Sequence, residues 1–142
     1  MSSYIPETLR VFVAKRAYNC CEYCLLSEED AFHRFHLDHI ISVKHRGQTI
    51  QENLALACQF CNRNKGSDVG SFLFSSNQFV RFFNPRIDKW DEHFYLDNGA
   101  ILSKTEIGEA TVKILNFNDA ELLIDRQLLI KAGTYPPKIL SQ

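Results

Sequence analysis

The stretch Cys58-Gln-Phe-Cys-Asn-Arg-Asn-Lys-Gly66 decides how this chain folds. Two cysteines that stand three positions apart can present two thiolates to one metal ion. The polar run after Cys61 predicts a short helix within residues 60–68, which Gly66 ends. An earlier stretch, Cys21-Glu-Tyr-Cys24, repeats the cysteine spacing, so the chain contains two such knuckles.

The two knuckles together predict a zinc site formed by Cys21, Cys24, Cys58 and Cys61. Four thiolates complete a tetrahedron and leave no open position for a catalytic water, so this zinc ion would be structural. Unrelated buried thiols are the alternative, which the matched spacing disfavours. Cys20 could replace Cys21 by using a longer spacer, although the spacing of the second knuckle favours Cys21.

Composition places the chain among folded proteins without a membrane partner. A chain of 142 residues with 45% hydrophobic residues can form one compact domain. We find no apolar run of about 18 residues or more and no signal-peptide pattern, so we expect a cytoplasmic protein. Cysteines in that compartment are usually reduced, which favours metal binding over disulfides.

The charge distribution indicates a local site for an anion. The net charge of −1 excludes a general attraction to polyanions. Between the knuckles and just after them, residues 33–65 contain five Lys or Arg side chains, two acids and four of the five histidines. A basic, histidine-rich segment in an otherwise neutral chain predicts a confined binding site.

Local patterns predict an α+β chain. In the first half we expect a helix over residues 6–18, a strand over 36–43, a loop over 44–52 and a second strand or turn over 53–57. Asn98-Gly99 predicts a hairpin turn within residues 94–102. Ser103 and Asn118, each followed three residues later by Glu, predict the starts of two helices, the second of which Gly133 ends.

The segment between the knuckles contains Phe35-His-Leu-Asp-His-Ile-Ile and then Asn53-Leu. Together with the knuckles it resembles the HNH endonuclease family, in its stand-alone bacterial form with a four-cysteine zinc frame. The motif residues are, in chain order, Cys21, Cys24, Asp38, His39, Asn53, Cys58, Cys61, Asn62 and Lys65. The resemblance covers about residues 20–68. It departs from the family pattern at Asn62, where the family name has His, and at Ser42, where Pro is frequent.

The resemblance implies a ββα-metal core, also called a His-Me finger, over residues 20–70. The four-cysteine zinc site would staple this core. An N-terminal helix over residues 1–19 and a C-terminal extension of a hairpin and helices over 71–142 would pack on it. The expected organisation is therefore one domain over residues 1–142.

The resemblance also implies hydrolysis of DNA phosphodiester bonds. His39 would activate water, Asp38 and Asn62 would hold a catalytic divalent ion, and Asn53 would brace the loop and orient His39. The residue types suit these roles, because carboxylate and amide oxygens favour Mg²⁺ or Mn²⁺ and histidine titrates near neutrality. Another divalent ion is compatible with the same ligands.

Four basic side chains are expected to contact DNA. Arg63 and Lys65, at the start of the short helix, would reach flanking phosphates. His45 and Arg46 would add contacts from the loop, although a solvated loop position is the simpler reading of His45. The short basic segment also leaves room for a partner protein or a second copy of the chain.

Three alternatives stay open at this point. Side chains alternate in a regular strand, so Asp38 would share a face with His36 rather than with His39, and His36 with Asp38 is a rival metal pair. A non-catalytic zinc-knuckle module that binds nucleic acid is the second. A zinc nucleobase deaminase is the third, but its His-x-Glu and Pro-Cys-x-x-Cys elements are replaced by His36-x-Asp and by Ala57 before Cys58.

Overall fold

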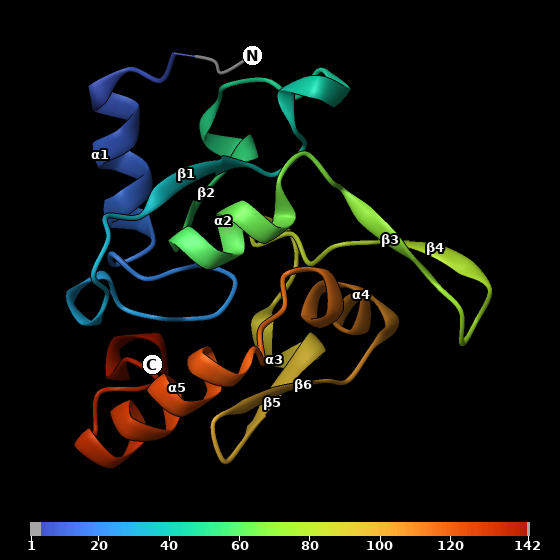
Figure 1. Ribbon diagram of the computed structural model, residues 1–142. Coiled ribbons are helices and arrows are strands. Elements are labelled where there is room, and N and C mark those ends of the chain that lie inside the picture. The colour runs from blue at the N-terminus through green and yellow to red at the C-terminus, as the bar shows by residue number, and fades with distance from the viewer. Residues whose placement is uncertain (1–3, 142) are drawn as a thin grey trace. The chain divides into compact units, whose positions relative to one another are not determined.

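The computed structural model describes residues 4–141 (Figure 1). The contacts within the chain define two compact units, residues 1–69 and residues 70–142, which we call the N-terminal unit and the C-terminal unit. Their boundary lies next to the expected limit between the core and the extension. That all 142 residues act as one domain stays a prediction.

The N-terminal unit contains two helices and one two-stranded sheet. Its elements are α1 (Glu7–Arg16), β1 (His36–His39), β2 (Leu54–Ala57) and α2 (Gln59–Lys65), with single 3-10 turns at Glu28–Asp30, Val43–His45 and Gln51–Asn53. The mixed helix and small-sheet class is confirmed, and β1, β2 and α2 follow one another as a ββα unit. β1 is shorter than expected, because the segment opposite Ile40 is the 3-10 turn Gln51–Asn53 rather than a strand, and the chain bends at Ile40.

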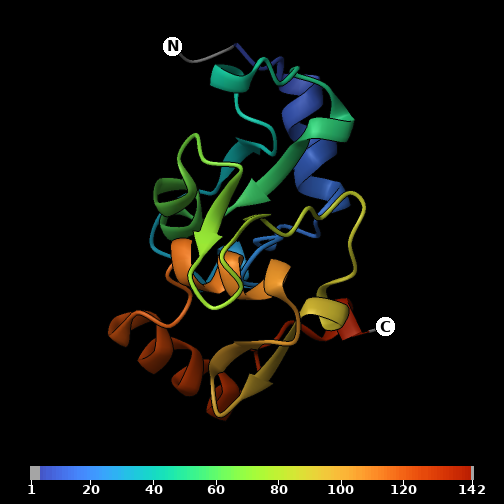
Figure 2. The ribbon, with the colours of Figure 1, turned by 90° about the vertical axis from the view of Figure 1, so that its right-hand side faces the viewer.

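The β1–β2 hairpin forms the centre of this unit. The strands are antiparallel, and Asp38 faces Ala55 while His39 faces Leu54. All four residues of β2 are buried, and α1 lies along this strand (Figures 1 and 2). The apolar cluster that joins them is small, and consists of Ile5, Val13, Ala17, Leu54 and Leu56.

Helix α1 begins after Pro6 and carries charges that suit its dipole. Glu7 lies in the first turn, whereas Lys15 and Arg16 lie in the last. The guanidinium of Arg16 donates to the carbonyls of Gln51 (2.9 Å) and Leu54 (2.7 Å). These bonds fix the end of α1 to the start of β2.

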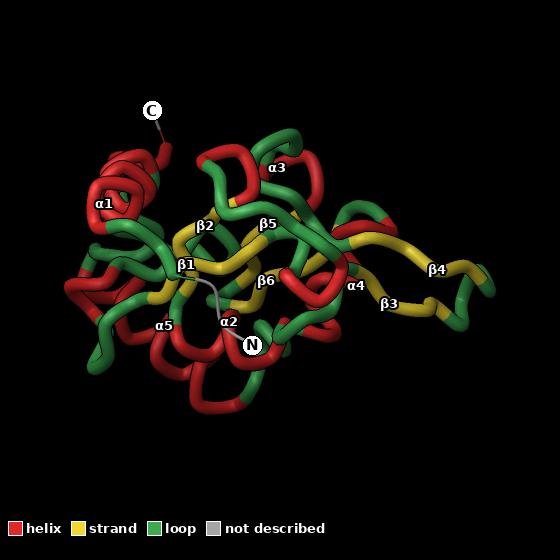
Figure 3. The backbone as a smooth tube through the Cα atoms, turned by 90° about the horizontal axis from the view of Figure 1, so that it is seen from above, coloured by secondary structure: helices red, strands yellow, loops and turns green. Residues whose placement is uncertain are grey.

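The C-terminal unit contains two hairpins and three helices. Its elements are β3 (Gly70–Leu73), β4 (Gln78–Arg81), α3 (Trp90–His93), β5 (Phe94–Asp97), β6 (Ala100–Ser103), α4 (Glu106–Ile114) and α5 (Ala120–Ala132), with a 3-10 turn at Lys138–Ser141. β3 pairs with β4 and β5 with β6, both antiparallel (Figure 3). The β5–β6 turn has positive φ at Asn98 and Gly99, as the sequence predicts.

The two helix starts in this unit lie close to their predicted positions, but other residues cap them. Thr105 rather than Ser103 caps α4, and Asp119 rather than Asn118 caps α5. Ser103 belongs to β6, and the Asn118 amide is already bonded to the backbone of Ile101. The end of α5 at Gly133, in the left-handed region, is as predicted.

Aromatic side chains fill the interior of the C-terminal unit. The ring of Phe94 lies 5.3 Å from that of Phe83 and 5.7 Å from that of Phe117, both in edge contacts. Ile101 and Leu115 are fully buried in the same unit. Within residues 4–141, no helix has the length and apolar composition that a membrane crossing requires.

Candidate functional site

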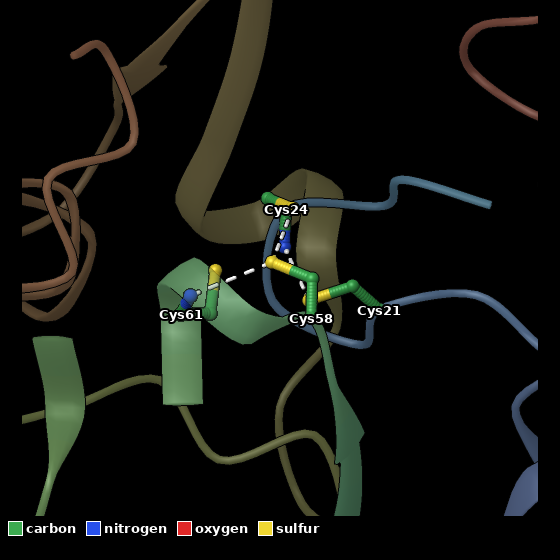
Figure 4. Close-up of side chains that lie close together, drawn as sticks. All are labelled: Cys21, Cys24, Cys58 and Cys61. Carbon is green, nitrogen blue, oxygen red and sulfur yellow. Dashed lines mark hydrogen bonds between the residues drawn. The ribbon is translucent and has the colours of Figure 1, made fainter. Parts of the chain in front are cut away.

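The four cysteines of the two knuckles converge inside the N-terminal unit. Their Sγ atoms all lie within 4.8 Å of one another, and all four side chains are buried (Figure 4). The Sγ atoms of Cys24 and Cys58 are 3.7 Å apart. Cys20 is also buried, but its thiol bonds to the carbonyl of Tyr18 at 3.3 Å and stands outside the cluster. The structure therefore selects Cys21 over Cys20.

The cluster has the donor set and spacing that zinc needs. A tetrahedral ion with bonds of about 2.3 Å separates its sulfurs by about 3.8 Å. Backbone N–H groups of Cys24 and Cys61 point at the sulfurs of Cys21 and Cys58, both at 3.4 Å. Hydrogen bonds from neighbouring thiols lower the pKa of Cys58, whereas burial raises the pKa of Cys61. A cation at the centre would let all four ionise together.

Asp38 lies on β1 and is almost completely buried, with 4% of its surface exposed. The Tyr23 hydroxyl donates to its Oδ2 at 2.6 Å. The Lys65 ammonium lies 3.2 Å from Oδ1 and 3.1 Å from Oδ2. Burial raises the pKa of Asp38 above its usual value, although Lys65 and Tyr23 act in the opposite direction.

Lys65 occupies a different place from the one expected of a phosphate contact. Helix α2 begins at Gln59 after the Cys58 cap, so Arg63 and Lys65 lie in its last turn and not at its start. Only 2% of the Lys65 surface is exposed, and its ammonium also donates to the carbonyl of His39 at 3.0 Å. This corrects the expectation that Lys65 reaches DNA at the surface. A buried ammonium needs a buried partner, which Asp38 provides.

His39 ends β1 and is half-buried. Its Nε2 lies 2.9 Å from the Thr49 hydroxyl, which leaves Nδ1 for another partner. Burial lowers the pKa of His39, and Lys65 lowers it further, while Asp38 raises it. The neutral imidazole is therefore favoured near neutrality, which is the form that accepts a proton.

Asn53 ties together the loop that follows β1. Its Oδ1 accepts from the N–H of Ile41 at 2.8 Å, and its Nδ2 donates to the carbonyls of Ile41 (3.0 Å) and Gln48 (2.8 Å). Gly47 lies against this junction, where a Cβ would stand 1.6 Å from the Ile41 carbonyl oxygen. The Asn53 side chain therefore fixes the loop that contains Thr49 through bonds to its backbone.

Ser42 fixes the other end of this loop. Its hydroxyl donates to the carbonyl of Ser67 at 2.9 Å, and the residue is buried. A proline at this position would lack that bond. The departure from the family pattern at Ser42 thus adds an anchor to this end of the loop.

One cavity of about 800 Å³ brings the candidate residues together. Asp38, His39 and Asn62 all line it, although Asp38 and His39 are neighbours on a strand. Among the described residues, the Asn62 side chain makes no hydrogen bond within the protein, so its amide oxygen is uncommitted. His36 lines the same cavity and is exposed, so the rival pair of His36 with Asp38 stays open.

The remaining basic residues of the sequence prediction lie on the surface. Arg63, His45 and Arg46 are all exposed. The Arg63 guanidinium stands 5.3 Å from the centre of the Phe60 ring, and Arg46 adopts the left-handed region with φ of 67°. Arg10 and Lys44, which the sequence did not single out, line the cavity itself.

Residues 21–68 match the model of the family described as HNH endonuclease. These residues form an HNH domain. The match includes both knuckles and every motif residue between them, and leaves residues 1–20 and 69–142 outside. No curated protein and no solved structure matches the chain. The HNH domain and the four-cysteine cluster support a nuclease with metal involvement and a nucleic acid substrate.

Two contact residues of the HNH domain escaped the sequence analysis. Tyr23 lies inside the first knuckle, where an aromatic residue would be expected to fill the core. Its hydroxyl nevertheless donates to Asp38. Thr49 stands in a polar loop, yet it holds His39. No spacing rule links Tyr23 to Asp38 or Thr49 to His39, because both pairs form only when the chain folds.

Proposed function

We propose that the HNH domain hydrolyses DNA phosphodiester bonds with a divalent ion held by Asp38 and Asn62 and with His39 as general base. One observation carries the proposal. The three residues line a single cavity, and all three belong to the segment that matches the family.

The ligand chemistry of the cavity fits Mg²⁺ or Mn²⁺. A carboxylate offers about four lone-pair sites. Tyr23 donates to Oδ2 of Asp38, whereas Oδ1 accepts only from Lys65. At least one lone-pair site on Oδ1 is therefore free for a metal ion. The Asn62 oxygen is uncommitted, and hard oxygen donors suit these ions. When bound, such an ion would stabilise charge on the phosphate and on the leaving oxygen.

His39 would take a proton from the attacking water at Nδ1. Thr49 holds Nε2, which fixes the orientation of the ring. The lowered pKa keeps the imidazole neutral, and so ready to accept that proton. Arg10 and Lys44 on the cavity wall would attract the phosphates that flank the scissile bond. Arg63, His45 and Arg46 would extend this contact over the surface.

Cleavage of supercoiled plasmid tests the proposal. The wild-type protein should convert the plasmid to nicked or linear forms with Mg²⁺ or Mn²⁺ and not in their absence. His39→Ala should reduce the rate about 10²- to 10⁴-fold, which is the contribution of a general base. His36→Ala is the matched control from the same strand, and should lower the rate far less. A larger loss at His36 than at His39 would favour the rival pair.

The same experiment separates the nuclease from a non-catalytic zinc-knuckle module. Such a module would bind DNA in a salt-dependent manner without divalent ions and would leave the plasmid intact. Equal activity in wild type and His39→Ala, or no cleavage by the wild type with any divalent ion, would contradict the proposal.

A further inference from the structure

The Asp38 carboxylate receives hydrogen bonds from two buried side chains, those of Tyr23 and Lys65. Tyr23 is fully buried and Lys65 is 2% exposed. Burying a carboxylate is unfavourable unless partners replace its water. The two donors replace that water and also fix the plane of the carboxylate, since they approach it from different elements.

Each of these donors is linked through the backbone to a different knuckle of the cysteine cluster. Tyr23 lies between Cys21 and Cys24 in the first knuckle. Lys65 ends α2, the helix that Cys58 caps and that contains Cys61. The position of the four sulfurs therefore sets the points from which both side chains reach Asp38.

The first knuckle is also fixed to the strand that pairs with β1. The Glu22 N–H donates to the carbonyl of Leu56, and the Leu56 N–H donates to the Glu22 carboxylate, both at 2.8 Å. Leu56 faces Leu37, the neighbour of Asp38 on β1. The knuckle thus holds the backbone beside Asp38 as well as its side chain.

We propose that Tyr23 and Lys65 are positioning residues that transmit the geometry of the four-cysteine site to Asp38 and His39. Tyr23 orients the Asp38 carboxylate toward the cavity. Lys65 holds the same carboxylate and, through the His39 carbonyl, the peptide that carries the general base. This inference rests on the proposed nuclease function and assigns these residues a part in it.

Tyr23→Phe is the decisive variant, because it removes one oxygen and keeps the ring in the core. Tyr18→Phe is the matched control, since Tyr18 belongs to the same unit and is 57% exposed. The full chain, loaded with zinc, is titrated with Mn²⁺ and followed by electron paramagnetic resonance. Zinc content, circular dichroism, kcat and KM for DNA are measured on the same samples.

The Tyr23→Phe protein should keep its zinc while its Mn²⁺ dissociation constant rises and its kcat falls, each about 10- to 100-fold. KM for DNA should stay within about twofold of wild type, because Tyr23 does not face the substrate. If Tyr23 had only a structural role, Tyr23→Phe would lower the melting temperature and leave the Mn²⁺ dissociation constant unchanged. Lys65→Met should show the same losses in its folded fraction, but it also leaves Asp38 without a cation.

Two results would overturn the inference alone. They are a Tyr23→Phe protein that binds Mn²⁺ and cleaves DNA like wild type, and one that loses its zinc. A wild-type protein that neither binds Mn²⁺ nor cleaves DNA would overturn the proposed function and this inference with it. The Mn²⁺ titration and the wild-type cleavage assay therefore distinguish the two failures.

Discussion

The two units of this protein use their interiors differently. The C-terminal unit is filled by aromatic rings, and its buried Arg126 and Thr111 bond to backbone groups (Gly99 and Phe83). The N-terminal unit has a small apolar cluster and gives much of its interior to four thiols and to the Asp38–Lys65 pair. A unit that buries reactive and charged groups has less apolar surface left to stabilise it. We therefore expect metal binding to hold the N-terminal unit and side-chain packing to hold the C-terminal unit.

Removal of zinc should have the largest effect and should act on one unit only. Structural zinc sites contribute apparent binding free energies on the order of 10 kcal/mol to folding. In the full chain treated with a chelator, amide hydrogens of β2 should lose their protection from exchange, whereas those of β5 and β6 should keep it. Hydrogen exchange with mass spectrometry measures both regions at once.

Cys20→Ser is the matched control for zinc removal, because Cys20 is buried beside the knuckle but lies outside the cluster. This variant should keep zinc and protection in β2. Trp90, the single tryptophan of the chain, reports on the C-terminal unit. A shift of its emission on chelation would show that the C-terminal unit also depends on zinc, and would favour one cooperative domain over residues 1–142.

Lys65→Met should be the next most damaging change. It leaves the Asp38 carboxylate buried without its cation, and breaking a buried pair on one side costs about 3–5 kcal/mol. Adding Asp38→Asn to Lys65→Met removes the uncompensated charge and should recover most of the lost stability. The unfolding free energies of wild type, Lys65→Met and the double variant are measured by chemical unfolding followed by circular dichroism. Lys15→Met is the control, because Lys15 is exposed. A double variant as unstable as Lys65→Met would show that the charge pair is not the cause.

Spacing along the chain predicted the features that depend on local geometry. The spacing of the cysteine pairs predicted the four-cysteine cluster, and Asn98-Gly99 predicted the β5–β6 turn. Each of these patterns is defined by residues a few positions apart in the sequence. The helix caps were displaced by one or two residues. Ser, Thr, Asn and Asp are all good N-cap residues, so the sequence does not decide between neighbours of these types. The Asn118 side chain accepts from the N–H of Ile101 instead of capping α5.

The contacts around Asp38 could not be predicted in the same way. A lysine at the end of a polar helix reads as a solvated or phosphate-binding residue, yet Lys65 points inward. Its direction depends on how α2 packs against β1, and the helix is capped by Cys58 and contains Cys61 of the cysteine cluster. The family resemblance named Asp38, His39 and Asn62 together, and all three line one cavity. The residues that bond to two of them, Tyr23 and Thr49, became visible only in the tertiary structure.

Phe117→Ala should destabilise the C-terminal unit and leave the zinc site intact. The side chain is 1% exposed and packs on Phe94, and replacing a buried Phe by Ala costs roughly 3–5 kcal/mol. Urea unfolding followed by Trp90 fluorescence should shift to a lower midpoint, while zinc content stays at the wild-type value. Phe74→Ala is the control, since Phe74 is 84% exposed and its loss should change stability by less than about 0.5 kcal/mol. Zinc release by Phe117→Ala would show that the two interiors are coupled.

Asp88→Asn should have the smallest effect, and this effect should depend on pH. The Arg81 guanidinium donates to both Asp88 oxygens, at 2.8 and 2.9 Å, and the Asn84 N–H donates to Oδ2 at 2.8 Å. These bonds, from Arg81 above all, lower the pKa of Asp88 below its usual value near 3.8. The Nε2 atom of His93 lies 3.8 Å from the Oδ1 atom of Asp88. Because Arg81 is half-exposed, we expect a loss of only about 1 kcal/mol.

The sign of this pH dependence follows from the lowered pKa. The unfolded chain binds the proton more tightly than the folded one, so the ionised Asp88 stabilises the fold above about pH 4. That stabilisation disappears as the pH falls through the lower pKa of the folded state. Trp90-detected urea midpoints of wild type and Asp88→Asn should therefore differ at pH 6 and converge below pH 4. A difference that stays constant to pH 3 would assign the effect to the neutral hydrogen bonds of residue 88 rather than to its charge.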